Sequence, residues 1–290
     1  MNPLKESFGH KTNLKMVLLA LFGATMGQGV VWYTSQFYAQ TFLLKTCNID
    51  ATQANTWMGI GLLIGTPFFV IFGSLSDKIG RKFIMLAGML IALLSYRYIF
   101  TQFYNYADIK QKTEIVDKTT VNVTRAADKA KPQDSVITTT TNKSFTDGSS
   151  YLEVKKETIL ADKSTTAPKP SIKKTVTLSD SYQWKVIGFV FILVIFVTMV
   201  YGPIAAFLVE LFPTQIRYTS MSLPYHIGNG VFGGLVPFIG TLLYEYSKTP
   251  ANPPGDVLAG LSYPIAIAAV CFIIGALYLS NKQQKQAITD

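Results

Sequence analysis

The sequence predicts an all-α membrane protein, with six transmembrane helices and a polar insert between the third and the fourth helix. Three observations lead to this fold class. The chain of 290 residues is 49% hydrophobic and only 15% charged, whereas a soluble domain carries about 25% charged residues. Its apolar residues gather in blocks of about 20 or more, which is long enough to cross a hydrocarbon core of about 30 Å as helices. More than half of the charged residues lie instead in one segment, 104–183.

The apolar blocks define six predicted spans, and backbone hydrogen bonding in lipid requires each of them to be a helix. Strands are excluded because no segments of about ten residues alternate in hydrophobicity. The first block is long and lacks a small-residue cleavage site, so it indicates a span and not a signal peptide. The spans are predicted at 15–38, 55–75, 83–103, 184–211, 219–246 and 257–280.

The domain organisation that we expect follows from these spans. Residues 1–103 hold a cytoplasmic N-terminus and the first three spans, and residues 184–290 hold the last three spans and a cytoplasmic tail. Residues 104–183 form the polar extracytoplasmic insert, for which a small β-rich module and a disordered loop are both open alternatives. Lys and Arg in the short flanks set this orientation, because they are more numerous on one side. The basic residues on that side are Lys5, Lys11, Lys15, Lys78, Arg81, Lys82, Arg217, Lys282 and Lys285.

Several function classes are excluded by the composition. The net charge of +9 does not indicate nucleic-acid binding, because the basic residues flank apolar blocks and form no single patch. Cys47 and Cys271 lie in unrelated contexts, so neither a disulfide framework nor a metal cluster is expected. The sequence contains no H-E-x-x-H and no G-x-x-x-x-G-K-[ST] motif. We therefore expect no enzyme, no cofactor and no ATP-driven pump.

The stretch "GSLSDKIGRK" separates the second and third predicted spans. Topology alone accounts for Lys78 and Lys82, but it does not require an acid at Asp77 or glycines at positions 73 and 80. Gly73 would allow a close approach of helices, and Gly80 would allow a turn with positive φ. Asp77 can face the N-terminus of another helix, where the helix dipole favours an anion.

A second charged stretch, "ELFPTQIRYTSMSLPYHIGNGVFGG", begins at Glu210. Glu210 ends the fourth predicted span and Arg217 precedes the fifth, and a turn through Pro213 can bring the two side chains together. Isolated charges at a membrane border can also be simple interfacial anchors, so both interpretations stay open.

Polar residues inside the spans predict a path for a solute. Gln28, Trp32 and Gln36 share one face of the first span, with Tyr33 at its border. Two glutamines would be costly if they faced lipid, although the aromatic residues alone could be an interfacial belt. In the fourth span, Tyr201 precedes a Gly-Pro pair that could kink the helix and place the tyrosine in a cavity.

The fifth span carries Tyr225, His226 and Asn229 just after Pro224. An ionisable residue inside the membrane is a functional candidate by default, and histidine changes its charge near neutral pH. His226 is therefore a candidate for proton coupling or for contact with an anionic substrate. A purely structural role as a buried histidine is the alternative.

The loop stretch resembles the motif of the major facilitator superfamily, roughly G-x-L-[AS]-D-[RK]-x-G-R-[RK], which follows the second helix of a six-helix half. The stretch from Glu210 is similar to the turn between the fourth and fifth helices in the C-terminal half of metabolite:proton symporters. "GQGVVWYTSQFYA" in the first span extends the resemblance, which covers all six spans and leaves out the insert. The resemblance implies that the six helices form one half of a major-facilitator fold.

The resemblance also implies a function, namely proton-coupled symport of a small organic acid or a zwitterionic osmolyte across a bacterial inner membrane. Asp77, Arg81, Glu210 and Arg217 would then form a charge network that holds an inner gate shut and breaks when the site opens inward. The alternative is a non-transporting membrane protein, either an inactive fragment or a receptor that presents the insert.

A transporter of this family has two six-helix halves with the substrate site between them, and this chain resembles the second half only. The partners that we expect are a small solute, a proton, the lipid bilayer and a second six-helix half. Three explanations are open: the chain is a fragment, it is one gene of a split transporter, or it associates with a second copy of itself.

Overall fold

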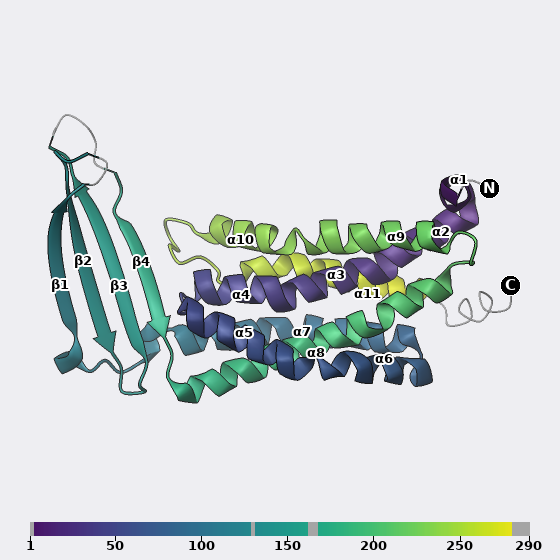
Figure 1. Cartoon of the computed structure of the whole chain (residues 1–290), viewed down its shortest axis with the longest axis horizontal. Coiled ribbons are helices and arrows are strands. Elements are labelled where there is room, and N and C mark those ends of the chain that lie inside the picture. The colour runs from purple at the N-terminus through teal and green to yellow at the C-terminus, as the bar shows by residue number, and fades with distance from the viewer. Residues whose placement is uncertain (1–2, 129–130, 162–167, 280–290) are drawn as a thin grey trace. The chain divides into compact units, whose positions relative to one another are not determined.

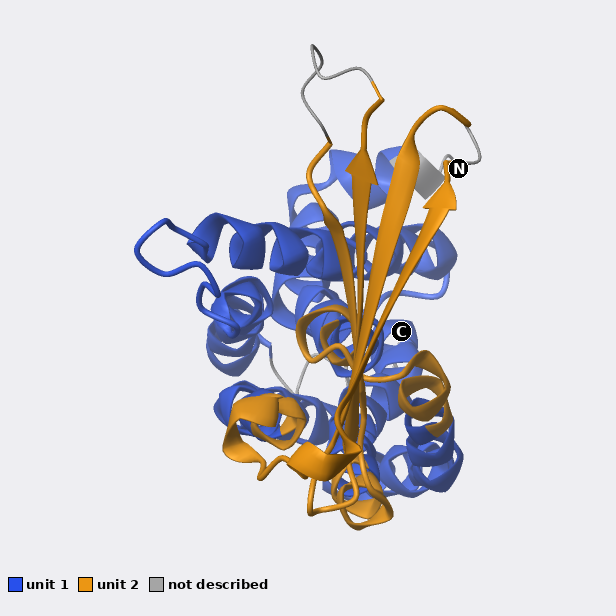
Figure 2. Cartoon of the chain, turned by 90° about the vertical axis from the view of Figure 1, so that its left-hand side faces the viewer, with its two compact units in different colours: residues 1–41, 57–102, 187–290 blue, residues 42–56, 103–186 orange. Residues whose placement is uncertain are grey.

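The computed structural model describes residues 3–128, 131–161 and 168–279. The chain forms two compact units, coloured separately in Figure 2. Unit 1 contains residues 1–41, 57–102 and 187–290, and unit 2 contains residues 42–56 and 103–186.

Six helices in the described part of the chain are long and apolar enough to cross a membrane, as the hydropathy pattern predicts. A short helix, α1 (Pro3–Gly9), precedes them. The first span runs from Lys11 to Thr46 through α2 (Lys11–Ala20), η1 (Leu21–Thr25), α3 (Met26–Tyr33), η2 (Thr34–Tyr38), α4 (Ala39–Thr41) and η3 (Phe42–Thr46). The second contains α5 (Ala51–Gly65) and α6 (Pro67–Ile79), and the third is α7 (Arg81–Ala107). The fourth is α8 (Asp180–Leu211), which continues through Pro203. The fifth contains α9 (Arg217–His226), η6 (Ile227–Gly233) and α10 (Val236–Ser247), and the sixth contains η7 (Ala259–Leu261) and α11 (Ser262–Tyr278).

The first and fifth spans contain π-helical turns, which are rare and occur often at functional sites. These two spans also approach each other closely. A Cβ atom added at Gly29 would collide with the carbonyl oxygen of Gly228, and one added at Gly233 would lie 2.6 Å from the ring of Tyr33. The glycines are thus required here by packing, because any side chain would force the two spans apart.

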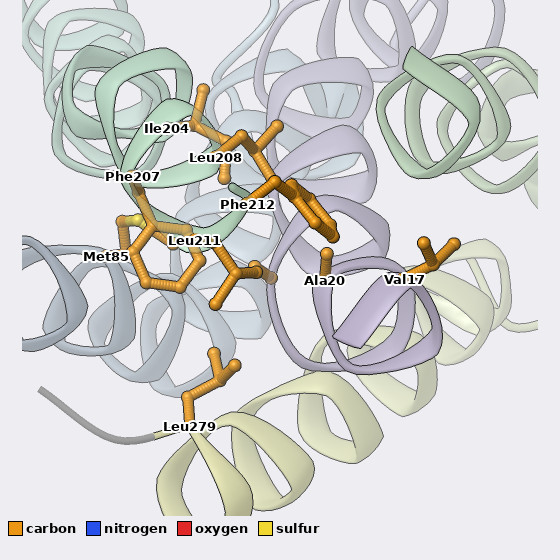
Figure 3. Packing of buried hydrophobic residues seen from close by; sticks show 10 residues of the cluster. Val17, Ala20, Met85, Ile204, Phe207, Leu208, Leu211, Phe212 and Leu279 are labelled. Atoms are coloured by element: carbon orange, nitrogen blue, oxygen red, sulfur yellow. The ribbon is translucent and has the colours of Figure 1, made fainter. Parts of the chain in front are cut away.

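A cluster of buried apolar side chains ties four spans of unit 1 together at one end (Figure 3). It draws on the first, third, fourth and sixth spans, and its side chains are almost fully removed from solvent. Removing one of the large members would leave a cavity and cost about 2–5 kcal/mol. The cluster contains Val17, Ala20, Ala24, Met85, Ile204, Phe207, Leu208, Leu211, Phe212 and Leu279.

The segment between α7 and α8 contains a four-stranded antiparallel sheet (Figure 1), so the prediction of an all-α protein is wrong in this part. Two 3₁₀ turns, η4 (Ile109–Gln111) and η5 (Val116–Lys118), precede it. The strands are β1 (Thr120–Ala127), β2 (Ser135–Ser144), β3 (Ser150–Ile159) and β4 (Ser171–Thr177), paired in chain order. Their β-branched residues favour strands, and the register sets Thr124 opposite Thr138 and Thr139 opposite Lys155. Every residue of the edge strand β1 is exposed.

Backbone pairing joins the start of the second span to this sheet within unit 2. Val176 of β4 donates to the carbonyl of Asn48 at 2.7 Å and accepts from the amide of Asp50 at 2.9 Å. The side chain of Gln53 also bonds both backbone groups of Leu178 at 2.9 Å. These bonds explain why residues 42–56 group with the sheet and not with the remaining helices.

Two ion pairs fix the loops at the base of the sheet. Lys112 lies 2.5 Å from Asp147, and its ammonium also lies 4.2 Å from the ring centre of Tyr182. Partial burial raises the pKa of Asp147, but hydrogen bonds from Lys112 and from the backbone of Ser149 outweigh this and leave that pKa below its ordinary value. Lys143 and Thr119 hydrogen-bond Glu114, and these bonds lower the pKa of Glu114.

The Asp147→Asn variant tests the contribution of the first pair. The native pKa of Asp147 lies below the ordinary value of 3.8, so the ionised form stabilises the fold above that value. This contribution is lost as the pH falls through the lower native pKa. At about pH 6 the variant should lose about 1–3 kcal/mol, because Lys112 loses its charged acceptor. The difference between the variant and the natural protein should shrink as the pH falls through the lowered native pKa of Asp147.

Hydrogen exchange of the β2 and β3 amides, referenced to the unfolded rate at each pH, measures this difference. Lys155→Gln is the matched control, because its pair with Glu157 is exposed and such pairs contribute about 0–1 kcal/mol. A deficit in Asp147→Asn that stays constant on acidification contradicts the assignment.

Candidate functional site

Three of the four predicted gate residues lie together, at the C-terminal ends of α6 and α8 and at the N-terminal end of α7. Arg81 opens α7, and its Nη2 lies 2.7 Å from Glu210 Oε1 and 2.9 Å from Asp77 Oδ1. Arg81 Nε also donates to Glu210 Oε2 at 3.0 Å, which makes the contact with Glu210 two-pronged. The side chains of Arg81 and Glu210 are 18% and 25% exposed, and that of Asp77 is 58% exposed. We call these three residues the charge cluster, and Glu210 is the main partner of Arg81 in it.

The turn before Arg81 explains how the loop sequence builds this cluster. Gly80 has φ of +104°, a conformation that side chains other than glycine rarely adopt, and it ends α6. The next helix therefore begins at once with Arg81. Gly73 has open space at its own Cβ position, but its backbone is approached by α8, where a Cβ added at Gly202 would lie 3.4 Å from Gly73 N.

The structure does not bring Arg217, the fourth predicted gate residue, to the carboxylates. Its Nε donates instead to the carbonyl oxygen of Phe212 at 3.2 Å, just beyond the C-terminus of α8. A cation in this place compensates the unpaired carbonyls and the dipole of the helix end. Arg217 thus acts on the shape of the turn that follows Glu210.

Lys82 has a role that topology alone did not indicate. Its Nζ donates to the carbonyl oxygen of Ala276 at 3.0 Å and to that of Leu279, at the C-terminal end of α11. Neighbouring residues of the loop motif therefore join α7 to two different helices, Arg81 to α8 and Lys82 to α11.

Most of the predicted substrate residues gather at the crossing of the first and fifth spans. The side-chain amides of Gln28 and Asn229 exchange two hydrogen bonds, at 3.0 Å and 3.1 Å, and both residues are buried. Asn229 Nδ2 also donates to the carbonyl of Tyr225 at 3.0 Å. Thr25 Oγ1, which sequence reasoning missed, donates to the carbonyl oxygen of Pro224 at 2.8 Å.

Aromatic side chains extend this group toward the fourth span. The hydroxyl oxygens of Tyr201 and Tyr225 are 2.6 Å apart, and the rings of Trp32 and Tyr201 are 5.0 Å apart in an edge-on contact. The ring of Phe69, which the sequence did not indicate as a site residue, lies 6.1 Å from that of Tyr201. The central cluster is defined by six half-buried or buried residues: Gln28, Trp32, Tyr33, Tyr201, Tyr225 and Asn229.

Two predicted residues lie outside the central cluster. Gln36 is half-buried on the same span, and no hydrogen bond joins its side chain to the cluster in the part of the chain that the structure describes. His226 is exposed, so it is not the buried structural histidine that the alternative required. Its ring lies 5.8 Å from that of Tyr225, which connects it to the edge of the cluster.

The chemistry available in the central cluster is hydrogen bonding and aromatic contact. Two amides, three phenols and an indole offer donors and acceptors for a small polar molecule, without a charged side chain in the cluster itself. Among the described residues, no group of three or more His, Cys, Asp or Glu side chains could hold a metal ion.

A pair of substitutions tests the coupling of the two buried amides. Asn229→Ala should lower the unfolding free energy by about 1–2 kcal/mol, because Gln28 is left buried without its partner. The double variant Gln28→Leu/Asn229→Leu should cost less than the sum of its single variants, since neither polar group then remains. Thermal unfolding in detergent measures these values, with Gln36→Leu as the control outside the cluster. Additive losses would show that the pair is not coupled.

Comparisons with known proteins agree with the resemblance in part of the chain. No family model matches, and no solved structure matches. The chain is 32% identical to the citrate-proton symporter of Klebsiella pneumoniae over 81 residues, which are 28% of this chain and 16% of that protein. It is 37% identical over 97 residues to a Haemophilus influenzae protein named "Putative metabolite transport protein", covering 33% of this chain and 20% of the relative. The matches thus span a fifth or less of these relatives' lengths. Together with the six apolar spans, they show an integral membrane protein that resembles the metabolite:proton symporters of the major facilitator superfamily.

Proposed function

We propose that the chain is the C-terminal half of a secondary active transporter, which carries out proton-coupled symport by alternating access. The observation that carries this proposal is the charge cluster, in which Arg81 joins the loop after α6 to the end of α8. The similarity to a citrate-proton symporter supports the reaction type and the absence of enzymatic activity. The solute that we propose is a small organic acid or a zwitterionic osmolyte.

The charge cluster acts as an inner gate in this proposal. While Arg81 bonds Glu210, the start of α7 is held against the end of α8, and the path to the cytoplasm is closed. Opening inward separates the two side chains, at a cost of up to about 3 kcal/mol. In this proposal, solute and proton bind the closed and open states with different affinities. This difference in affinity shifts the equilibrium between the two states.

The central cluster receives the solute in this proposal. It lies at the crossing of two spans with π-helical turns, and its amides and phenols can replace the hydration of a carboxyl or ammonium group. His226 at its edge is the residue that we assign to proton coupling. Its imidazole ring can both accept and release a proton, which none of the amide groups can do.

A second six-helix half is part of the proposal, whether it comes from a longer chain, another gene or a second copy. The second and fifth spans are the least covered in the described structure. In their most apolar stretches only 17% and 22% of residues are buried, against 61% in the fourth span. The uncovered apolar faces of these two spans could pack against the helices of a second six-helix half. In the orientation that we propose, in a bacterial inner membrane, both termini and the charge cluster are cytoplasmic, and the sheet of unit 2 is outside.

A membrane receptor that presents the sheet is the competing function. The folded sheet with its exposed strand β1 favours this alternative, because such an edge can bind another chain. A simple membrane anchor, however, needs neither the charge cluster nor the buried amide pair. A receptor would show no solute uptake with any variant, which distinguishes it from the transporter.

The gate is tested by removing its charges one at a time. Arg81→Gln, Glu210→Gln and Asp77→Asn should each abolish uptake without preventing membrane insertion, because the closed state loses its ion pairs. Lys78→Gln is the matched control, since Lys78 is an exposed cation of the same loop. Uptake of labelled organic acids and osmolytes by the natural host, at equal surface level, measures the effect. Near-normal uptake by Glu210→Gln contradicts the gate.

Proton coupling is tested at the edge of the central cluster. His226→Gln should remove the dependence of uptake on external pH, because the imidazole that we assign to proton uptake and release is then absent. The chain contains two histidines, and His10→Gln is the matched control. His10 lies between α1 and α2, outside the spans, and is paired with Glu6 of α1 at 3.0 Å. An unchanged pH profile for His226→Gln assigns the coupling elsewhere.

A further inference from the structure

A groove of about 450 Å³ lies between the first and sixth spans, and none of its lining residues belongs to the charge cluster or to the central cluster. Its walls come from α2, η1 and α11. The residues that matter for its chemistry are Lys11, Leu14, Lys15, Leu18, Phe22 and Tyr278.

The helix periodicity explains how one side of the groove is built. Positions 11, 14, 15, 18 and 22 are three or four residues apart, so they form a continuous stripe on one face. Both lysines lie at the start of the stripe and the apolar residues follow. With a rise of 1.5 Å per residue, the stripe from Lys11 to Phe22 is about 16 Å long. This length matches one leaflet, or half of a hydrocarbon core of about 30 Å.

The residues of the groove are open to a ligand. Lys11, Lys15, Leu14, Leu18 and Tyr278 are all exposed. Neither lysine forms a salt bridge with a carboxylate within the described ranges. Among the described residues, these two cations thus lie at the polar end of an apolar groove without a carboxylate partner.

A second groove of about 450 Å³ on the other side of α11 has a different polar end. Its single lysine, Lys82, already donates to the carbonyls of Ala276 and Leu279. The groove with Lys11 and Lys15 is therefore the better candidate for binding an external anion.

We propose that the groove between α2 and α11 binds an anionic phospholipid, with an acyl chain along Leu14, Leu18 and Phe22 and the headgroup at Lys11 and Lys15. The bilayer places phosphate groups at the level where a span begins, and apolar chains below them. Charge complementarity favours a headgroup with net negative charge, since the ammonium of a zwitterionic lipid would compete with the lysines. A protein partner would have to supply both an apolar segment and an acid at this one place.

Native mass spectrometry of the full chain in detergent tests this proposal. The probes are phosphatidylglycerol and phosphatidylcholine with identical acyl chains, titrated separately. The natural protein should retain phosphatidylglycerol more strongly. Lys11→Gln/Lys15→Gln should weaken that binding about 10- to 30-fold, at about tenfold or less per lysine, and should change phosphatidylcholine binding little.

Two further variants separate the headgroup from the acyl chain. Lys5→Gln/Lys45→Gln removes the same charge from exposed positions outside the groove and should leave binding unchanged. Leu18→Ser should weaken both lipids, because the exposed side chain contacts the acyl chain and not the headgroup. Equal phosphatidylglycerol binding by the two double-lysine variants overturns the proposal. Displacement of phosphatidylglycerol by millimolar inorganic phosphate also overturns it, since the site would then hold a free anion.

Discussion

The candidate site depends on the close crossing of the first and fifth spans. In lipid there is little hydrophobic force between helices, so their association rests on close packing and on polar contacts across the interface. Gly29 and Gly228 remove the side chains that would separate the two backbones. That proximity allows Thr25 to reach the carbonyl of Pro224 and allows Gln28 and Asn229 to exchange their amide bonds. Tyr201 from the fourth span then completes a cluster that neither of the two crossing spans could form alone.

The helical part of the fold was predictable because hydropathy and length report directly on lipid contact. The six spans follow from that signal, although the first continues to Thr46, beyond the predicted end at residue 38. The sheet was only one of two alternatives for the insert. A strand is easiest to predict when one of its faces is buried and the other is exposed. β1 is exposed along its whole length, so its burial does not alternate between the two faces. Pairing of Val176 with Asn48 and Asp50 connects segments far apart in sequence, which no local pattern reports.

The site was predictable where a motif fixes the local geometry, and not elsewhere. Gly80 ends α6 and places Arg81 at the start of α7, so the motif spacing carries structural information that brings Arg81 to Glu210. Arg217 is the counterexample, because its choice between a carboxylate and the carbonyl of Phe212 depends on the path of the turn between α8 and α9. The exposure of His226 could not be read from its neighbours either. It depends on which helices cover the fifth span, and that span is among the least covered.

The basic residues of the loop motif make different contacts, and these contacts connect the proposed gate with the proposed lipid groove. Lys78 is exposed, Arg81 bonds α8 through Glu210, and Lys82 bonds the end of α11. Because Arg81 and Lys82 are adjacent at the start of one helix, a displacement of α7 that separates Arg81 from Glu210 also strains the bonds of Lys82. The same end of α11 carries Tyr278, a wall of the groove that we assign to an anionic lipid. If both proposals hold, a lipid that bound more tightly in one position of α11 would bias the proposed gate by the difference between its two affinities, and opening of the gate would change lipid affinity by the same factor.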